Sequence, residues 1–149
     1  MQTQLMFLPG QEVLIPVSPS AFTAAVGPRR RLSRYVGALV VSPSGEARTI
    51  KSIRVEGIWG SSTLRRFVSL LTSAWSISVE FDASAPLPIG ELKERVVRCI
   101  QADAGDSEPY LPRQRPLEEV ISGVRGAHSV EGIFQEIAVP RPEDALDVL

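Results

Sequence analysis

The stretch YVGALVVSPSGEARTIKSIRVEGIW, residues 35–59, decides the fold that the sequence predicts. Residues 35–42 are apolar on both faces, which is typical of a central strand. The turn residues at 43–45, Pro-Ser-Gly, are followed by a second strand over 47–59. The stretch therefore predicts a β-hairpin on which a sheet is built.

Alternating apolar and polar residues mark the next strand. Residues 75–82, WSISVEFD, keep this alternation throughout, as a strand with one buried face does. Its apolar members are expected to line the core: Trp75, Ile77, Val79 and Phe81. Residues 12–17 predict a further short strand, and Pro16 places it at an edge because proline cannot donate to a ladder.

Three segments in the first two thirds of the chain carry helical patterns. Residues 62–73 and 91–103 place apolar side chains at helical spacing, so each predicts an amphipathic helix. Residues 18–27 carry helix punctuation, with Ser18 as a cap at one end and Gly27 as a left-handed cap at the other.

After the second amphipathic helix the character of the sequence changes. Residues 106–116 form a proline-spaced polar connector. Residues 117–124 predict a short helix. Residues 130–139 fit either a helix capped by Ser129 or a strand, because Gly132 weakens a helix by about 1 kcal/mol.

These elements predict an α+β fold: a mixed or antiparallel sheet with helices packed on one face and a small helical C-terminal region. A chain of 149 residues can bury a core as one domain without a metal or disulfide staple. We divide this single domain, residues 1–149, into a core over 11–105, the connector over 106–116 and a helical region over 117–149.

Composition excludes several classes of protein. Hydrophobic residues make up 44% of the chain, charged residues 22%, and the net charge is −1, which excludes wholesale disorder. The longest apolar run, residues 35–41, is far shorter than the ~18 residues of a membrane helix. Residues 1–10 lack the basic start of a signal peptide. We therefore expect a cytoplasmic protein with no membrane partner.

Residues suited to catalysis or metal binding are scarce. Cys99 is the only cysteine and His128 the only histidine, which excludes a multi-cysteine zinc site. Cys99 lies on the inward stripe of its helix, where a cysteine behaves as a small hydrophobe. Glu80 and Asp82 share one face of a strand, and without a partner base they fit the solvated side of a sheet. The sequence favours a noncatalytic protein without a cofactor.

Charge is distributed unequally between the two halves of the chain. Residues 1–79 contain nine basic and three acidic residues, whereas residues 80–149 contain seven basic and fourteen acidic ones. Such asymmetry is typical of a basic binding face, of an acidic tail, of self-association, or of two halves that pack together through opposite charge.

The basic half supplies the candidate binding surface. A run of arginines starts at residue 29, and the outward face of the predicted strand 47–59 carries another arginine. The junction from Gly60 to Arg66 resembles an anion site, because an anion at a helix N-terminus would offset two nearby arginines. A solvated loop and a serine-capped helix explain these stretches without any ligand. The candidate residues are Arg29, Arg30, Arg31, Arg34, Arg54, Ser61, Ser62, Arg65 and Arg66.

We expect a noncatalytic protein-binding module: an assembly adaptor, or a small inhibitor of the immunity or antitoxin type. Its partner would be another protein or a second copy of this chain. The alternative is an anion- or nucleic-acid-binding protein that uses the basic N-terminal half. Salt distinguishes the two, because phosphate recognition weakens steeply as salt rises and an apolar protein interface weakens much less.

Overall fold

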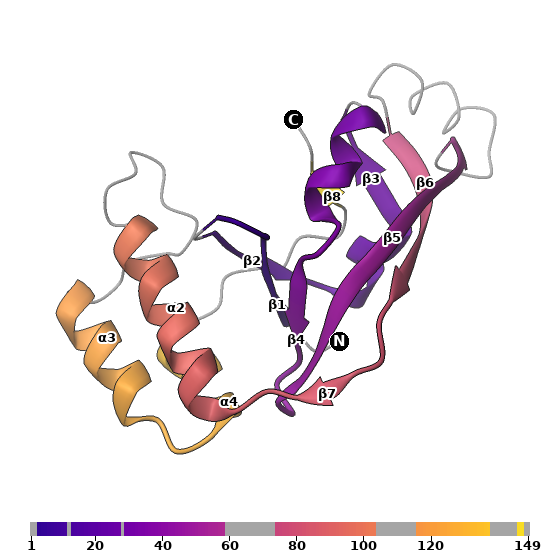
Figure 1. Cartoon of the computed structure of the whole chain (residues 1–149). Coiled ribbons are helices and arrows are strands. Elements are labelled where there is room, and N and C mark those ends of the chain that lie inside the picture. The colour runs from indigo at the N-terminus through magenta and orange to yellow at the C-terminus, as the bar shows by residue number, and fades with distance from the viewer. Residues whose placement is uncertain are drawn as a thin grey trace.

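A computed structural model describes residues 3–11, 13–27, 29–58, 74–103, 116–137 and 146–147, which form a curled sheet and several helices (Figure 1). The strands are β1 (Gln4–Phe7), β2 (Leu14–Val17), β3 (Ala24–Val26), β4 (Leu39–Val41), β5 (Glu46–Ile58), β6 (Ala74–Phe81), β7 (Ala85–Pro86) and β8 (Leu146–Asp147). The α-helices are α2 (Ile89–Asp103), α3 (Leu117–Gly126) and α4 (Val130–Glu136), and the 3₁₀ helices are η1 (Pro19–Thr23) and η2 (Arg29–Tyr35). The predicted α+β class is confirmed.

The sheet is antiparallel except at one edge. Its strand order is β2-β1-β4-β5-β6-β3-β8, with β7 paired to β5, and only β3 and β8 run parallel among the described pairs. The predicted hairpin is present as β4 and β5, with Leu39 opposite Thr49. As the proline predicts, β2 lies at an edge of the sheet and pairs only with β1 among the described strands.

Strands β1, β2 and β4 are buried on both faces and separate two hydrophobic cores. On one side Leu5 and Phe7 of β1 face the helices, in what we call the helix core. On the other side Met6 belongs to a cluster with buried residues of β3, β5 and β6, in what we call the sheet core. The helix core also contains Leu14, Val41, Leu92, Val96, Cys99, Val124 and Ile133. The sheet core also contains Ile15, Val17, Phe22, Tyr35, Val40, Ile50, Ile77 and Leu146.

A bulge in β5 keeps its apolar residues on the sheet core. Ile50 pairs with Phe81, but Ser52 pairs with Glu80, so β5 contains one extra residue between these two pairs. Side chains alternate along a strand, and the extra residue resets that alternation. Ile53 therefore packs on the same core as Ile50, although the two are three positions apart.

The predicted inward face of β6 is confirmed. Trp75, Ile77, Val79 and Phe81 all contact the sheet core, with Ile77 buried and the other three half-buried. The Trp75 indole Nε1 donates a hydrogen bond to the backbone oxygen of Gly27, 3.1 Å away. This bond fixes the start of β6 to the end of β3.

The helix predicted over residues 18–27 is wrong. Only the 3₁₀ turn η1 forms, and the chain then becomes β3, in which Ala24 pairs with Ser76 and Ala25 with Trp75. A short helix is marginal on its own propensity. The ladder bonds to β6 and the burial of the alanines therefore prevail. Gly27 does adopt the expected left-handed conformation, with φ of 110°.

The strand predicted over residues 35–42 is shorter than expected. Tyr35 ends η2, and only Leu39–Val41 is a strand. Gly37, with φ of 90°, turns the chain between the two and donates its backbone N–H to the Ile50 oxygen at 2.8 Å. The arginine run, for which a solvated loop was an alternative, is instead helical because Leu32 and Tyr35 are buried in the sheet core.

The structure adds one strand at the N-terminus and settles part of the C-terminal region. Strand β1 was not predicted, and it extends the sheet beyond the expected core of residues 11–105. Within residues 130–139, for which helix and strand were both open, Val130–Glu136 form the helix α4, and the Ser129 hydroxyl accepts a hydrogen bond from the backbone N–H of Gly132 at 3.0 Å. The helix predicted over 62–73 lies outside the described residues, as does the connector up to residue 115. None of the helices in the described ranges combines the length and the hydropathy that spanning a bilayer requires.

Replacing Gly45 by alanine should lower the free energy of unfolding by about 1–2 kcal/mol, since a left-handed backbone strains any residue with a Cβ atom. Gly45 has φ of 92° in the β4–β5 turn, and an added Cβ would lie 3.3 Å from Val130 Cγ2 of α4. Urea denaturation measures the change.

Gly126→Ala is the control, because a Cβ there meets nothing within 4 Å and its φ is not in the left-handed region. That variant should be neutral or more stable by up to about 1 kcal/mol. Equal effects of the two substitutions would contradict the turn geometry.

Candidate functional site

The structure describes only part of the predicted binding surface. The side chains of Arg31, Arg34 and Arg54 are described, and the backbone of Arg29 and Arg30 begins η2. The other candidate residues lie outside the described residues: Ser61, Ser62, Arg65 and Arg66. The anion site predicted for this stretch therefore also lies outside them.

Arg31 and Arg34 project from η2 into solvent. Leu32 and Tyr35 of the same helix are buried, so the arginines sit on an anchored element. Residues three apart in a 3₁₀ helix lie on the same side. The Arg34 guanidinium carbon lies 5.9 Å from the centroid of the Tyr35 ring, at cation–π distance.

Arg54 lies on the outer face of the β5–β6 ribbon, opposite Ser78 in the strand register. In Figure 1 the three α-helices lie on the side of β1, β2 and β4, away from this ribbon. The charged side chains of the ribbon's outer face are exposed. We call this surface the ribbon face: Lys51, Ser52, Arg54, Glu56, Ser78 and Glu80.

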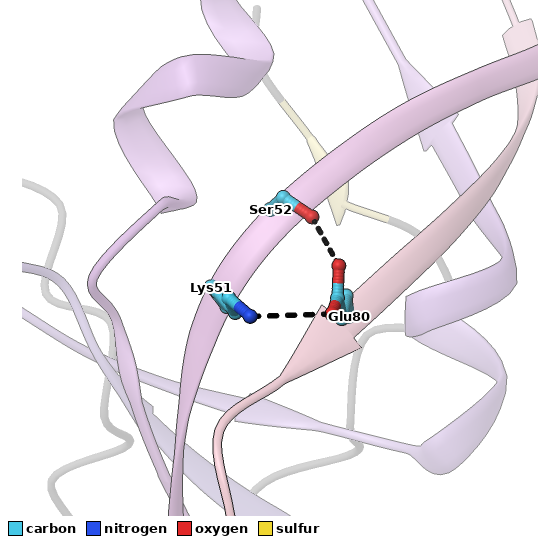
Figure 2. A network of polar contacts seen from close by, with 3 residues as sticks. All are labelled: Lys51, Ser52 and Glu80. Atoms are coloured by element: carbon cyan, nitrogen blue, oxygen red, sulfur yellow. Dashed lines mark hydrogen bonds and ion pairs between the residues drawn. The ribbon is translucent and has the colours of Figure 1, made fainter.

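Glu80 is held by two neighbours on the adjacent strand, as Figure 2 shows. The Ser52 hydroxyl donates to Glu80 Oε2 at 3.1 Å, and Lys51 Nζ lies 3.5 Å from Oε1. The Ser52 hydrogen bond, and then the Lys51 charge, hold the pKa of Glu80 below its ordinary value. Lys51 therefore pairs with Glu80 across the two strands, and the carboxylate is ionised at neutral pH.

Arg48 is a residue that sequence reasoning missed. Its guanidinium carbon lies 3.8 Å from the centroid of the Phe81 ring and 5.7 Å from that of Phe22. The two rings meet edge to face, 5.2 Å apart. Partial burial lowers the pKa of Arg48 from its ordinary value. The arginine joins the end of β6 to η1, so its role here is structural.

A groove of about 450 Å³ lies between α2 and the turn that joins β1 to β2. We call it the α2 groove; its lining includes Phe7, Leu8, Leu39, Arg95, Arg98 and Cys99. Sequence reasoning missed this site because Arg95 and Arg98 fall on the polar side of a helix in the acidic half. Their spacing of three was the available signal, since it places both on one helix face.

Cys99 and His128, two of the groups considered for catalysis, lie where the sequence predicts, whereas Asp82 does not belong to the strand. Cys99 is buried in the helix core, and His128 is exposed in the turn between α3 and α4. Within the described ranges there is no group of three or more His, Cys, Asp and Glu residues placed to hold a metal ion. Asp82 is exposed beyond the end of β6.

No protein-family model, no curated protein and no solved structure matches this chain. The ribbon face and the α2 groove are therefore the observations from which a function has to be inferred.

Replacing Ser52 by alanine should raise the pKa of Glu80 toward its ordinary value, because the hydroxyl hydrogen-bonds the ionised form. A carboxyl group whose pKa is lowered by folding stabilises the folded state at pH values above its ordinary pKa. That stabilisation is lost as the pH falls through the lowered pKa. A carboxyl NMR titration of Glu80 measures the change. Ser44→Ala, whose hydroxyl bonds to Ser42 instead, is the control. An unchanged Glu80 titration in Ser52→Ala would refute the assignment.

Proposed function

We propose that this chain is a noncatalytic protein-binding module that contacts its partner through the ribbon face. The supporting observation is the unequal covering of the sheet. Helices pack over β1, β2 and β4, whereas the charged residues on the outer face of the β5–β6 ribbon remain exposed.

The ribbon face has features that suit recognition of another protein. Both strands pack on the sheet core from behind, so the backbone is held before a partner arrives. Glu80 is already hydrogen-bonded, which lowers the ordering cost of binding. No hydrogen bond joins exposed Arg54 to another described residue, and arginine is enriched at protein interfaces.

The described surface favours a polar interface over an apolar one. Val36, 40% exposed, is the single large hydrophobic residue classed as exposed among the described side chains. A face that carries both signs of charge selects its partner by electrostatic complementarity, which controls specificity and association rate. An assembly adaptor and a small inhibitor of the immunity or antitoxin type both fit this surface, with a different protein or a second copy of the chain as partner.

The alternative function, anion or nucleic-acid binding by the basic half, is supported by one observation. Arg31 and Arg34 lie exposed on the same side of an anchored helix, which fits contact with phosphates better than a flexible loop does. Its location differs from that of the ribbon face, so substitutions can separate the two.

Arg54→Glu should weaken partner binding about tenfold or more, because like charges placed across an interface are repulsive. Affinity capture from the source cells, followed by titration of the captured protein, measures the loss. Sedimentation of the pure chain tests self-association in parallel.

Glu131→Arg is the matched control, since it reverses an exposed charge on α4 and should leave binding unchanged. Equal binding by the wild type and Arg54→Glu would contradict the proposal. A captured nucleic acid whose binding falls steeply with salt and is lost in Arg31→Gln/Arg34→Gln would establish the alternative.

A further inference from the structure

We propose that the α2 groove binds a small organic anion, with its carboxylate held by Arg95 and Arg98 and a short apolar body against Phe7 and Leu39. This site is separate from the ribbon face and does not depend on the function proposed above.

The charge of the groove is one-sided. Arg95 and Arg98 both line it from successive turns of α2, and none of the other described lining residues is an aspartate or glutamate. Glu91 reaches Arg95 along the helix, but the Nη2–Oε1 distance is 3.4 Å and both side chains are partly exposed. This ion pair offsets part of the charge of Arg95, whereas Arg98 is not part of it.

The two guanidinium groups have unused donors. Arg95 Nε is buried and has no hydrogen-bond partner among the described residues. An unpaired buried donor carries the full cost of its lost hydration, and an anion accepting from it would remove that cost. No hydrogen bond or ion pair joins Arg98 to another described residue. Arginine binds carboxylates through two parallel hydrogen bonds, for which both side chains have capacity.

The rest of the lining selects for an apolar body. Phe7, Leu8, Leu39 and Cys99 contribute apolar surface, and Thr49 and Gln11 add neutral polar groups. The volume of about 450 Å³ lies within the usual range of pockets for small ligands. Phe7, Leu8 and Cys99 are buried behind the groove, whereas Leu39 is half-buried. A bare inorganic ion would fill only part of the volume and leave the accessible part of Leu39 in water, so a carboxylate with a short hydrocarbon body fits better.

A neighbouring pocket differs from the α2 groove in the charges of its lining residues. The pocket of about 290 Å³ between α2 and α3 is lined by Lys93, Arg98 and Arg125, but also by Glu94. Lys93 Nζ there already donates to the backbone oxygen of Arg125, 2.9 Å away. Lys93 of that pocket is thus bonded within the chain, whereas Arg98, which lines both pockets, has no hydrogen bond or ion pair with another described residue.

The test is a titration of the full-length protein with acetate, butyrate, hexanoate and inorganic phosphate, each against matched sodium chloride, followed by amide chemical shifts. We expect saturable shifts at residues 95–99 with hexanoate and butyrate, and weaker binding of acetate and phosphate. Because the lost bonds involve charged groups, Arg95→Gln and Arg98→Gln should each weaken hexanoate binding about tenfold or more. Cys99 lines the groove, so its reaction with a thiol reagent should slow as the ligand saturates.

Arg54→Gln on the ribbon face is the matched control and should bind hexanoate as the wild type does. Arg95→Lys keeps the charge and should retain partial binding, and far-ultraviolet circular dichroism shows whether each variant is folded. Shifts that do not saturate, or that persist in folded Arg95→Gln/Arg98→Gln, would overturn the proposal. Tighter binding of phosphate than of hexanoate would overturn the assignment of an apolar body.

Discussion

Burial of β1, β2 and β4 on both faces is the constraint on which the rest of the structure depends. Leu5 and Met6 are adjacent in β1, face opposite cores and are both 0% exposed. A strand in this position needs apolar side chains at consecutive positions, because neither face meets water. The constraint forces a two-sided architecture: helices must cover one face, and the sheet must curl to cover the other.

The surfaces available for binding follow from this arrangement. Helices α2, α3 and α4 pack on the doubly buried strands, and β5 and β6 continue beyond them with one face toward solvent. The ribbon face is the part of the sheet that the helices do not reach. The α2 groove forms where α2 meets the turn between β1 and β2, so its arginines lie beside Phe7 of β1 and Leu39 of β4.

The strands that expose one face to solvent could be predicted from the sequence. Alternation in residues 75–82 gave β6 and its inward face, and the same logic placed Arg54 on an outward surface. Full burial removes alternation, which is why β1 could not be recognised as a strand. For β3, helix signals between Ser18 and Gly27 were outweighed by pairing with β6, an interaction that exists only in the folded chain.

The roles of side chains whose neighbours are distant in the sequence could not be predicted either. Arg48 acquires its role from Phe22 and Phe81, and Arg95 acquires its groove from Phe7 and Leu39. The residues next to Arg48 do not distinguish it from a solvated arginine, and the spacing of three between Arg95 and Arg98 indicates only a shared helix face. Bulges act in the same way, since the extra residue at Lys51 is visible only from the pairing with Glu80 and Phe81.

The most direct test of this account is whether the two cores unfold as one. In a Trp59→Phe background, Trp75 is the only tryptophan and reports on the sheet core, while circular dichroism reports on the helices. Val96→Ala removes apolar contacts from the helix core alone. If the doubly buried strands couple the cores, urea should unfold both probes in one coincident transition, and Val96→Ala should shift both midpoints equally. A shift confined to the circular dichroism signal, with the Trp75 transition unmoved, would contradict the account.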